Sequence, residues 1–168
     1  VPEILTIDVE HDFIIMEDLG TRLFVQRDPP RPIEARYAAA VDARDVDALM
    51  RLYDPKVRVF DAWGLWSYEG AEAWRVAVEG WLTSLGSERV KASFEDVQTS
   101  GNSDHAALTA IVRYAAFSAT GEPVRSMHNR ITWVLRTSGH VLRIVHEHTS
   151  APIDFDHMKA ILERAEQA

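Results

Sequence analysis

Two histidines near the end of the chain are the first candidates for chemistry. His146 and His148 occupy alternate positions of a strand predicted over residues 141–149, so both side chains fall on one face of that strand. Leu142 and Ile144 share this face, which carries no Asp, Glu, Lys or Arg, and this favours the interior of the protein. Because histidine titrates near neutral pH, the pair is predicted to transfer protons or to contact a ligand.

A carboxylate at the end of an earlier strand is the second candidate. Asp61 lies in a strand predicted over residues 57–62, and Trp63, Trp66 and Trp74 follow it closely. Aromatic neighbours would remove water from the carboxylate and raise its pKa toward a range useful for a general base. The alternative is that Asp61 caps the following loop by accepting backbone N–H groups. The sequence leaves both interpretations open.

A metal site is an alternative role for the histidines. His128, on a neighbouring predicted strand, could join His146 and His148 as a third ligand. Apart from Asp61, however, no nearby acidic residue shares the predicted inward face, and such histidine pairs are commonly hydrogen-bonded pocket residues. We therefore expect no metal and no cofactor.

A pocket for a small ligand is predicted from the aromatic residues. The ligand contacts that we expect are Tyr53, Trp63, Trp66, Trp74, Tyr114, His128 and Arg130, whereas Trp81 is expected in the core. Arg130 has two interpretations. In the pocket it would bind a carboxylate-bearing ligand, but its alternation with Ile131 and Trp133 places it on the outer face of a sheet.

The composition excludes several classes of protein. The chain has 168 residues and a formal net charge of -8, and no basic cluster that would attract nucleic acid is present. Cysteine is absent, which excludes disulfides and thiolate chemistry and fits the cytoplasm. No apolar run is long enough to span a bilayer, and the first residues do not resemble a signal peptide. We expect a cytoplasmic protein that binds neither nucleic acid nor membrane.

Three segments are predicted along the chain. Residues 1–31 form an accessory arm in which Leu5, Ile7 and Val9 alternate with polar residues, as in a short strand. Residues 32–152 form the main domain, and residues 153–168 form a helical extension, with the helix at about 156–166.

The main domain begins with helices and continues with strands. Three helices are predicted. The first begins at Pro32, the second follows Asp45 as its N-cap, and the third covers residues 71–85 and ends at Gly86. Long strands joined by Gly-containing turns then follow, which is typical of an antiparallel sheet. This order of elements indicates an α+β fold.

Two stretches of the main domain resemble known families. Residues 33–70 read IEARYAAAVDARDVDALMRLYDPKVRVFDAWGLWSYEG, which is similar to the opening of ketosteroid isomerase and its SnoaL-like relatives. Residues 130–152 read RITWVLRTSGHVLRIVHEHTSAP, which resembles the association domain of calcium/calmodulin-dependent protein kinase II. All are members of the nuclear transport factor 2-like superfamily. The resemblance implies a cystatin-like fold, a cone-shaped roll of curved antiparallel sheet against three N-terminal helices.

The resemblance also implies roles for two residues. In ketosteroid isomerase an aspartate at the end of the first strand is the general base and a tyrosine on the first helix is the oxyanion donor. These positions match Asp61 and Tyr37, which lie 24 residues apart. His146 or His148 would then act as a second acid–base group. Tyr37 has the alternative of being a core residue with a satisfied hydroxyl.

One departure from the isomerase pattern is clear. The isomerase also uses a protonated aspartate on the strand that here reads Met127 to Trp133, where this chain has no carboxylate. We therefore do not expect a steroid isomerase. The leading hypothesis is a cofactor-free isomerase, dehydratase or cyclase acting on a small hydrophobic or carboxylate-bearing ligand, in a homodimer. The alternatives are a non-catalytic binding domain and an oligomerisation module of the same fold.

Overall fold

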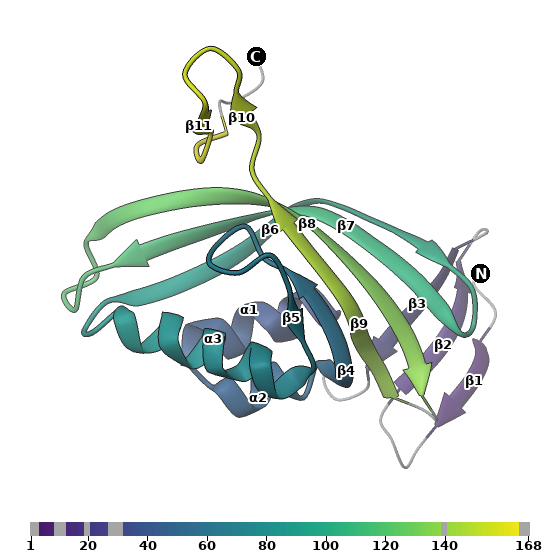
Figure 1. Cartoon of the computed structure of the whole chain (residues 1–168). Helices are drawn as coiled ribbons and strands as arrows, with labels where there is room; N and C mark the ends of the chain where they lie inside the picture. Colours follow the sequence, from purple (N-terminus) through teal and green to yellow (C-terminus); the bar gives the residue numbers. More distant parts are fainter. Residues whose placement is uncertain (1–3, 9–12, 19–20, 27–31, 139–140, 165–168) are drawn as a thin grey trace.

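A curved sheet with helices on one face forms the body of the protein (Figure 1). The structure is a computed structural model that describes residues 4–8, 13–18, 21–26, 32–138 and 141–164. The main sheet has six strands in the order β5-β4-β9-β8-β7-β6. The predicted α+β architecture is confirmed.

The three helices of the described residues begin where the sequence indicates, and α3 ends shortly before Gly86, as predicted. They are α1 (Ile33–Ala43), α2 (Val46–Met50) and α3 (Ala71–Ser84). The side chain of Asp45 caps α2 by accepting a 2.8 Å hydrogen bond from the backbone N–H of Ala48. Arg44 (φ 54°) lies in the left-handed region after α1, as Gly86 (φ 55°) does after α3.

Long hairpins make up most of the sheet. Its strands are β4 (Tyr53–Phe60), β5 (Tyr68–Glu69), β6 (Arg89–Gly101), β7 (His105–Phe117), β8 (Pro123–Ser138) and β9 (Val141–Ser150). All neighbouring pairs are antiparallel except β4 and β9, which pair in parallel. The first strand of the body therefore lies beside the last, and the ends of β4 and β9 meet at one place.

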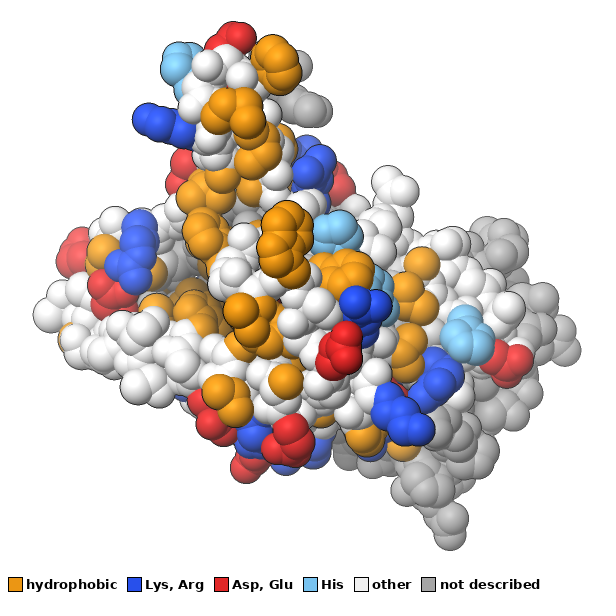
Figure 2. All heavy atoms as spheres, in the orientation of Figure 1, with side chains coloured by type: hydrophobic (Ala, Val, Ile, Leu, Met, Phe, Trp, Pro, Cys, Tyr) orange, Lys and Arg blue, Asp and Glu red, His pale blue; other side chains and the backbone are white. Residues whose placement is uncertain are grey.

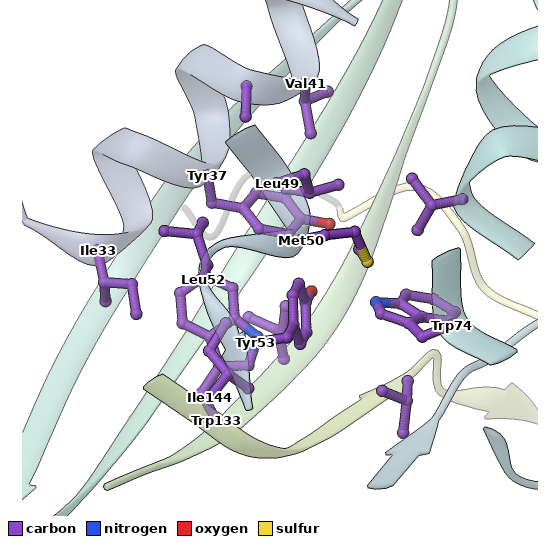
Figure 3. Packing of buried hydrophobic residues seen from close by; sticks show 14 of the residues in the cluster. Ile33, Tyr37, Val41, Leu49, Met50, Leu52, Tyr53, Trp74, Trp133 and Ile144 are labelled. Carbon is purple, nitrogen blue, oxygen red and sulfur yellow. The ribbon is translucent and has the colours of Figure 1, made fainter. Parts of the chain in front are cut away.

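The hydrophobic core fills the space between the helices and the concave face of the sheet. Trp133, Val41 and Val59 have no exposed surface, and Tyr37 and Tyr53 are also buried (Figure 3). Alternate positions along β8 explain this arrangement, because Ile131, Trp133 and Leu135 all point inward.

A bulge in β9 changes which of its residues point inward. Leu135 pairs with Ile144, but the adjacent Val134 pairs with His146, so Val145 is an extra residue in the ladder. An extra residue reverses the alternation beyond it. Glu147 and Thr149 are consequently buried on the concave face, whereas simple alternation from Ile144 predicts His146 and His148 there.

The accessory arm forms a small sheet of its own. Its strands are β1 (Ile4–Asp8), β2 (Phe13–Asp18) and β3 (Thr21–Gln26), paired antiparallel in that order. The strand predicted from Leu5 and Ile7 is present as β1, while Val9 lies outside the described residues. Strand β3 lies next to β6 of the main sheet.

The helix predicted at residues 156–166 is wrong over the described part, through residue 164. A hairpin of β10 (Ile153–Asp154) and β11 (Lys159–Ala160) replaces it. The carboxylate of Asp154 accepts the backbone N–H groups of Asp156 and His157, and this turn competes with a helix. Among the described helices, none is long and apolar enough to cross a membrane.

Candidate functional site

A cavity of about 270 Å³ lies between α3, the concave face of the sheet and the loop that joins β4 to β5. We call it the inner cavity. Its lining residues are Tyr37, Asp61, Trp63, Gly64, Tyr68, Trp74, Ala77, Val78, Trp81, Tyr114, Met127, Asn129, Glu147 and Thr149. Among the described residues that line it, two are carboxylates and none is lysine, arginine or histidine.

Asp61 directly follows β4, at the start of the loop to β5, and its side chain lines the inner cavity. Its Oδ1 accepts hydrogen bonds from the Thr149 hydroxyl (2.7 Å) and from the backbone N–H of Ala62 (2.9 Å). Burial raises the pKa of Asp61, although these hydrogen bonds act in the opposite direction. Asp61 therefore caps the loop, as one interpretation predicts, and it also lines the cavity as a partly desolvated carboxylate. Its role as a general base stays a prediction.

Glu147 is a second carboxylate of the inner cavity, and sequence reasoning missed it. Only 1% of its surface is exposed, and its Oε2 accepts the Tyr53 hydroxyl (2.6 Å) and the Trp133 indole N–H (2.7 Å). Burial raises the pKa of Glu147 to about 7, against the effect of these two hydrogen bonds and with a smaller contribution from Asp61. The only signal in the sequence was one acidic residue in an otherwise acid-free strand.

Two tyrosines provide hydroxyl groups beside the carboxylates. The hydroxyls of Tyr37 and Tyr114 lie 2.9 Å apart, within hydrogen-bond distance. Burial raises the pKa of both phenols well above the ordinary value, so both stay protonated at neutral pH. In the view of Figure 3, the polar ends of Tyr37, Tyr53 and Trp74 point toward the side chain of Met50.

Aromatic side chains form most of the remaining wall. The Trp81 ring packs edge-on against Tyr114 at 5.6 Å, and Tyr68 lies 5.2 Å from Trp74. Trp81 is therefore a wall residue as well as part of the core. Two buried polar atoms, Asn129 Oδ1 and Trp74 Nε1, have no hydrogen-bond partner among the described residues. Such atoms are suited to a polar group on a ligand.

The loop between β4 and β5 separates the inner cavity from a second hollow. We call this hollow the outer cleft; it is lined by Arg58, Phe60, Asp61, Ala62, Trp63, Gly64, Leu65, Trp66, Ser67 and His148. Trp66 is 98% exposed, and Figure 2 shows hydrophobic side chains gathered over this loop and on the C-terminal hairpin. Trp63 lines both spaces, whereas Trp66 contacts only the outer cleft.

The inward orientation predicted for His146 and His148 is wrong. The bulge at Val145 turns both to the convex side, where their rings lie 5.0 and 5.9 Å from Phe60. His146 Nδ1 lies 2.8 Å from the carbonyl oxygen of Arg58, and His148 is exposed. Neither histidine lines the inner cavity, so the structure does not place them with Asp61 and Tyr37.

Two predicted ligand contacts also face the convex side. Arg130 is exposed and donates a 3.2 Å hydrogen bond to the Ser150 hydroxyl. His128 lies beside the C-terminal segment, 3.8 Å from the Glu163 carboxylate. The alternation of β8 explains both positions, because Asn129 and Ile131 take the inward places. The sequence-based reason for a carboxylate-bearing ligand, an arginine in the pocket, therefore does not hold.

Tyr53 has a different position from the one predicted. It is 1% exposed, it does not line the inner cavity, and its hydroxyl is used by Glu147. Of the other predicted site residues, Asp61, Tyr37, Trp63, Trp74 and Tyr114 meet in the inner cavity. Within the described residues, no group of three histidine, aspartate or glutamate side chains could hold a metal ion.

The arrangement pairs acceptors with donors inside an apolar wall. Asp61 lies at the edge of the cavity and Glu147 is fully enclosed. The hydroxyl groups of Tyr37 and Tyr114 lie within hydrogen-bond distance of each other. A desolvated carboxylate is a stronger base than one in water, and a phenol stabilises a developing oxyanion. These groups together are suited to proton transfer on an uncharged molecule.

Comparisons with known proteins identify the domain family. A family model described as a SnoaL-like domain matches residues 33–154. A search of curated proteins found no match.

Solved structures show the same fold at low sequence identity. An NTF2-like protein of unknown function from Pseudomonas putida has a TM-score of 0.69 and 21% identity, covering 79% of this chain and 91% of its own. An NTF2-like protein with a cystatin-like fold from Novosphingobium aromaticivorans has a TM-score of 0.60 and 18% identity, with coverage of 70% and 76%. Aln2 from a Streptomyces species has a TM-score of 0.63 and 13% identity, with coverage of 70% and 84%.

Proposed function

We propose that the inner cavity catalyses proton transfer at a carbon atom. The chain belongs to the SnoaL-like domain family, whose fold supports small-molecule binding. The reaction needs no cofactor, because a carboxylate can take the proton and hydroxyl groups can stabilise the resulting charge. The reaction class is isomerisation, dehydration or cyclisation, all of which begin with such a step.

The position of Asp61 is the observation that carries this proposal. It lines an apolar cavity, and burial raises its pKa above the ordinary value for aspartate. Its bond to Thr149 fixes the orientation of the carboxylate. A fixed, partly desolvated carboxylate at the wall of a cavity has the properties of a general base.

The tyrosine pair is suited to donate a hydrogen bond to an oxygen atom of the substrate. Tyr114 lines the cavity, and the hydroxyl oxygen of Tyr37, on α1, lies 2.9 Å from the hydroxyl oxygen of Tyr114. One hydroxyl donates to the other, so the pair can offer a proton to an enolate oxygen while remaining satisfied. Removal of one such donor typically lowers a rate by ~10²–10³-fold.

The walls favour a ring-bearing substrate without a negative charge. Trp74, Trp81 and Tyr68 supply flat apolar surface, and the described lining contains no cationic side chain. A ligand carboxylate would enter beside Asp61 and Glu147 with no counter-charge, which is unfavourable in a desolvated site. We propose a small hydrophobic molecule as the ligand.

A carbon acid that needs only a base tests the proposal. 5-Nitrobenzisoxazole loses its ring C–H proton to a base and opens to a coloured cyanophenolate, with no proton required at oxygen. We expect the protein to accelerate this reaction and Asp61→Asn to reduce the acceleration by ~10²–10⁴-fold. Asp156→Asn, on the exposed hairpin, is the matched control. Equal rates for wild type and Asp61→Asn contradict the proposal.

The same variants separate the alternative functions. A non-catalytic binding domain predicts that Asp61→Asn alters ligand affinity with no acceleration in either protein. An assembly module predicts an oligomer larger than a dimer, which light scattering measures directly. The homodimer expected from the sequence stays a prediction that the same measurement tests.

A further inference from the structure

Glu147 has no role in a reaction that needs only one base, yet it is among the most enclosed residues of the protein. Only 1% of its surface is exposed, and it lines the inner cavity. An isolated buried carboxylate without a cation is unfavourable when it is charged, so burial favours the protonated acid. Its titratable neighbours are Tyr37, Tyr53, Tyr114 and Asp61, none of which supplies a positive charge.

The hydrogen bonds of Glu147 determine where a proton on its carboxyl group must lie. Tyr53 from β4 and Trp133 from β8 both donate to the same oxygen, Oε2. An oxygen that accepts two donors acts as the carbonyl oxygen of the neutral acid. The proton then lies on Oε1, which has no hydrogen bond from the described residues. Glu147 is therefore arranged as a proton donor to the cavity.

The position along β9 brings this donor near the base. Glu147 and Thr149 are successive inward residues beyond the bulge, and Thr149 bonds Asp61 at 2.7 Å. Successive residues on one face of a strand lie about 7 Å apart. A ring compound bound between these residues can thus contact Asp61 at a carbon and Glu147 at an oxygen two or three bonds away.

We propose that Glu147 is a second catalytic residue, which protonates the carbonyl oxygen of a neutral ring ketone while Asp61 removes a proton from the adjacent carbon. This inference rests on the proposed function. The C–H bond breaks and its electron pair forms the C=C bond of an enol. The carbonyl π electrons take the proton from Oε1, so Asp61 becomes neutral and Glu147 becomes the carboxylate.

This exchange explains why two carboxylates can share a cavity whose described lining has no cation. Before and after the step the pair carries one negative charge, which moves from Asp61 to Glu147. The Tyr53 and Trp133 bonds at Oε2 stabilise the charge where it arrives. A ketone that carried its own negative charge would lose this balance, so the site selects neutral ketones.

Deuterium exchange at carbon tests the inference with defined probes. Cyclohexanone, 1-indanone and 1-tetralone are neutral ring ketones of increasing size, and NMR in D₂O follows exchange next to their carbonyl groups. We expect the wild type to accelerate exchange of at least one of them. The rate should fall on the alkaline side with a midpoint near pH 7, where Glu147 loses its proton.

Glu147→Gln is the informative variant. Glutamine keeps an oxygen for Tyr53 and Trp133 and presents an N–H to the cavity, but it has no acidic proton to transfer. We expect the exchange rate to fall at least ~10-fold and the alkaline limb to disappear. Circular dichroism and the unfolding midpoint of the variant show whether it folds. Carbon-13 NMR of the Glu147 carboxyl in the wild type measures the titration directly.

Several results overturn the inference, and they differ from those that overturn the proposed function. Exchange by Glu147→Gln within about twofold of the wild type, with the same alkaline limb, removes the acid role. No acceleration with any of the three ketones also removes it. In both cases the proposed function still stands if Asp61 accelerates the opening of 5-nitrobenzisoxazole, which needs no acid. If neither reaction depends on Asp61, both proposals are wrong.

Discussion

The inner cavity and the outer cleft lie on two sides of one loop and share Asp61, Trp63 and Gly64. Consecutive residues of β9 enter the two spaces. Glu147 is 1% exposed on the inner side, whereas His148 is exposed on the outer side. Histidine has the side chain more commonly associated with acid–base chemistry, but here the glutamate occupies the enclosed position.

The difference shows that enclosure, more than residue type, determines how strongly the pKa of a side chain is shifted here. On the inner side, burial favours uncharged forms, and fixed donors take the place of water. On the outer side, solvent reaches the histidines and Trp66, which is 98% exposed. The following predictions test this contrast in decreasing order of size.

The largest difference is expected between the effects on catalytic rate of one substitution in the inner cavity and one in the outer cleft. Asp61→Asn should lower the rate of 5-nitrobenzisoxazole opening by ~10²–10⁴-fold, or about 3–5 kcal/mol. His148→Gln, on the outer side, should leave the rate within about twofold. Initial rates at matched protein concentration measure both. An equally large loss in His148→Gln would mean that the outer cleft is part of the site.

Tryptophans of the two sides should differ in their contribution to stability. Trp133 is fully buried and donates to Glu147, so Trp133→Ala should lower the free energy of unfolding by about 3–5 kcal/mol. Trp66→Ala should change it by less than about 0.5 kcal/mol, because the side chain contacts mainly water. Urea titration gives both values. A large loss in Trp66→Ala would reveal a packing partner for the outer loop.

The dependence of stability on pH should identify the enclosed carboxylate. The folded protein holds the proton of Glu147 up to about pH 7, while the unfolded chain releases it near 4.5. Between these values the native state binds more protons, so the free energy of unfolding decreases as pH rises, by up to about 3 kcal/mol from this residue. That contribution is fully present below the lower value.

Glu147→Gln provides the comparison, because it cannot titrate. Denaturant titrations of both proteins between pH 4 and pH 8 should show a stability difference that changes with this sign. A difference that stays constant across the range would mean that Glu147 has the same pKa in the folded and the unfolded protein.

The smallest predicted effect concerns one hydrogen bond to Glu147. Tyr53→Phe removes a 2.6 Å bond that favours the ionised form, so the pKa of Glu147 should rise further, by about one unit. Carboxyl carbon-13 shifts measure the midpoint. Tyr68→Phe is the matched control, since Tyr68 lines the cavity without a bond to Glu147. Equal shifts in both variants would contradict the assignment of this bond.

Local patterns were sufficient to predict most elements of the body. The caps at Asp45 and Gly86, the stripe of α3 and the hairpins of the sheet all depend on neighbours in sequence. The C-terminal helix was predicted wrongly because turn bonds from the Asp154 side chain compete with helical periodicity. The second and third strands of the arm, β2 and β3, were not predicted.

The candidate site was only partly visible in the sequence. Asp61, Tyr37, Trp63, Trp74 and Tyr114 were all predicted as site residues and all line one cavity. Asp61 and Tyr37 were assigned from the family resemblance, and Trp63, Trp74 and Tyr114 were assigned as aromatic residues. One of the two interpretations of Arg130, the outer face of the sheet, is correct. It followed from the alternation of β8, which is uninterrupted through the centre of the strand.

Periodicity along the chain is therefore enough to indicate an α+β fold, the order of its elements and the faces of its regular strands, and the resemblance of two stretches to known families added the family fold. The chemistry of β9, in contrast, depends on tertiary contacts. One extra residue at Val145, accommodated through pairing with β8, exchanged the histidines for Glu147 in the inner cavity. The periodic pattern cannot reveal a bulge, because its position depends on the register between two strands rather than on either strand alone.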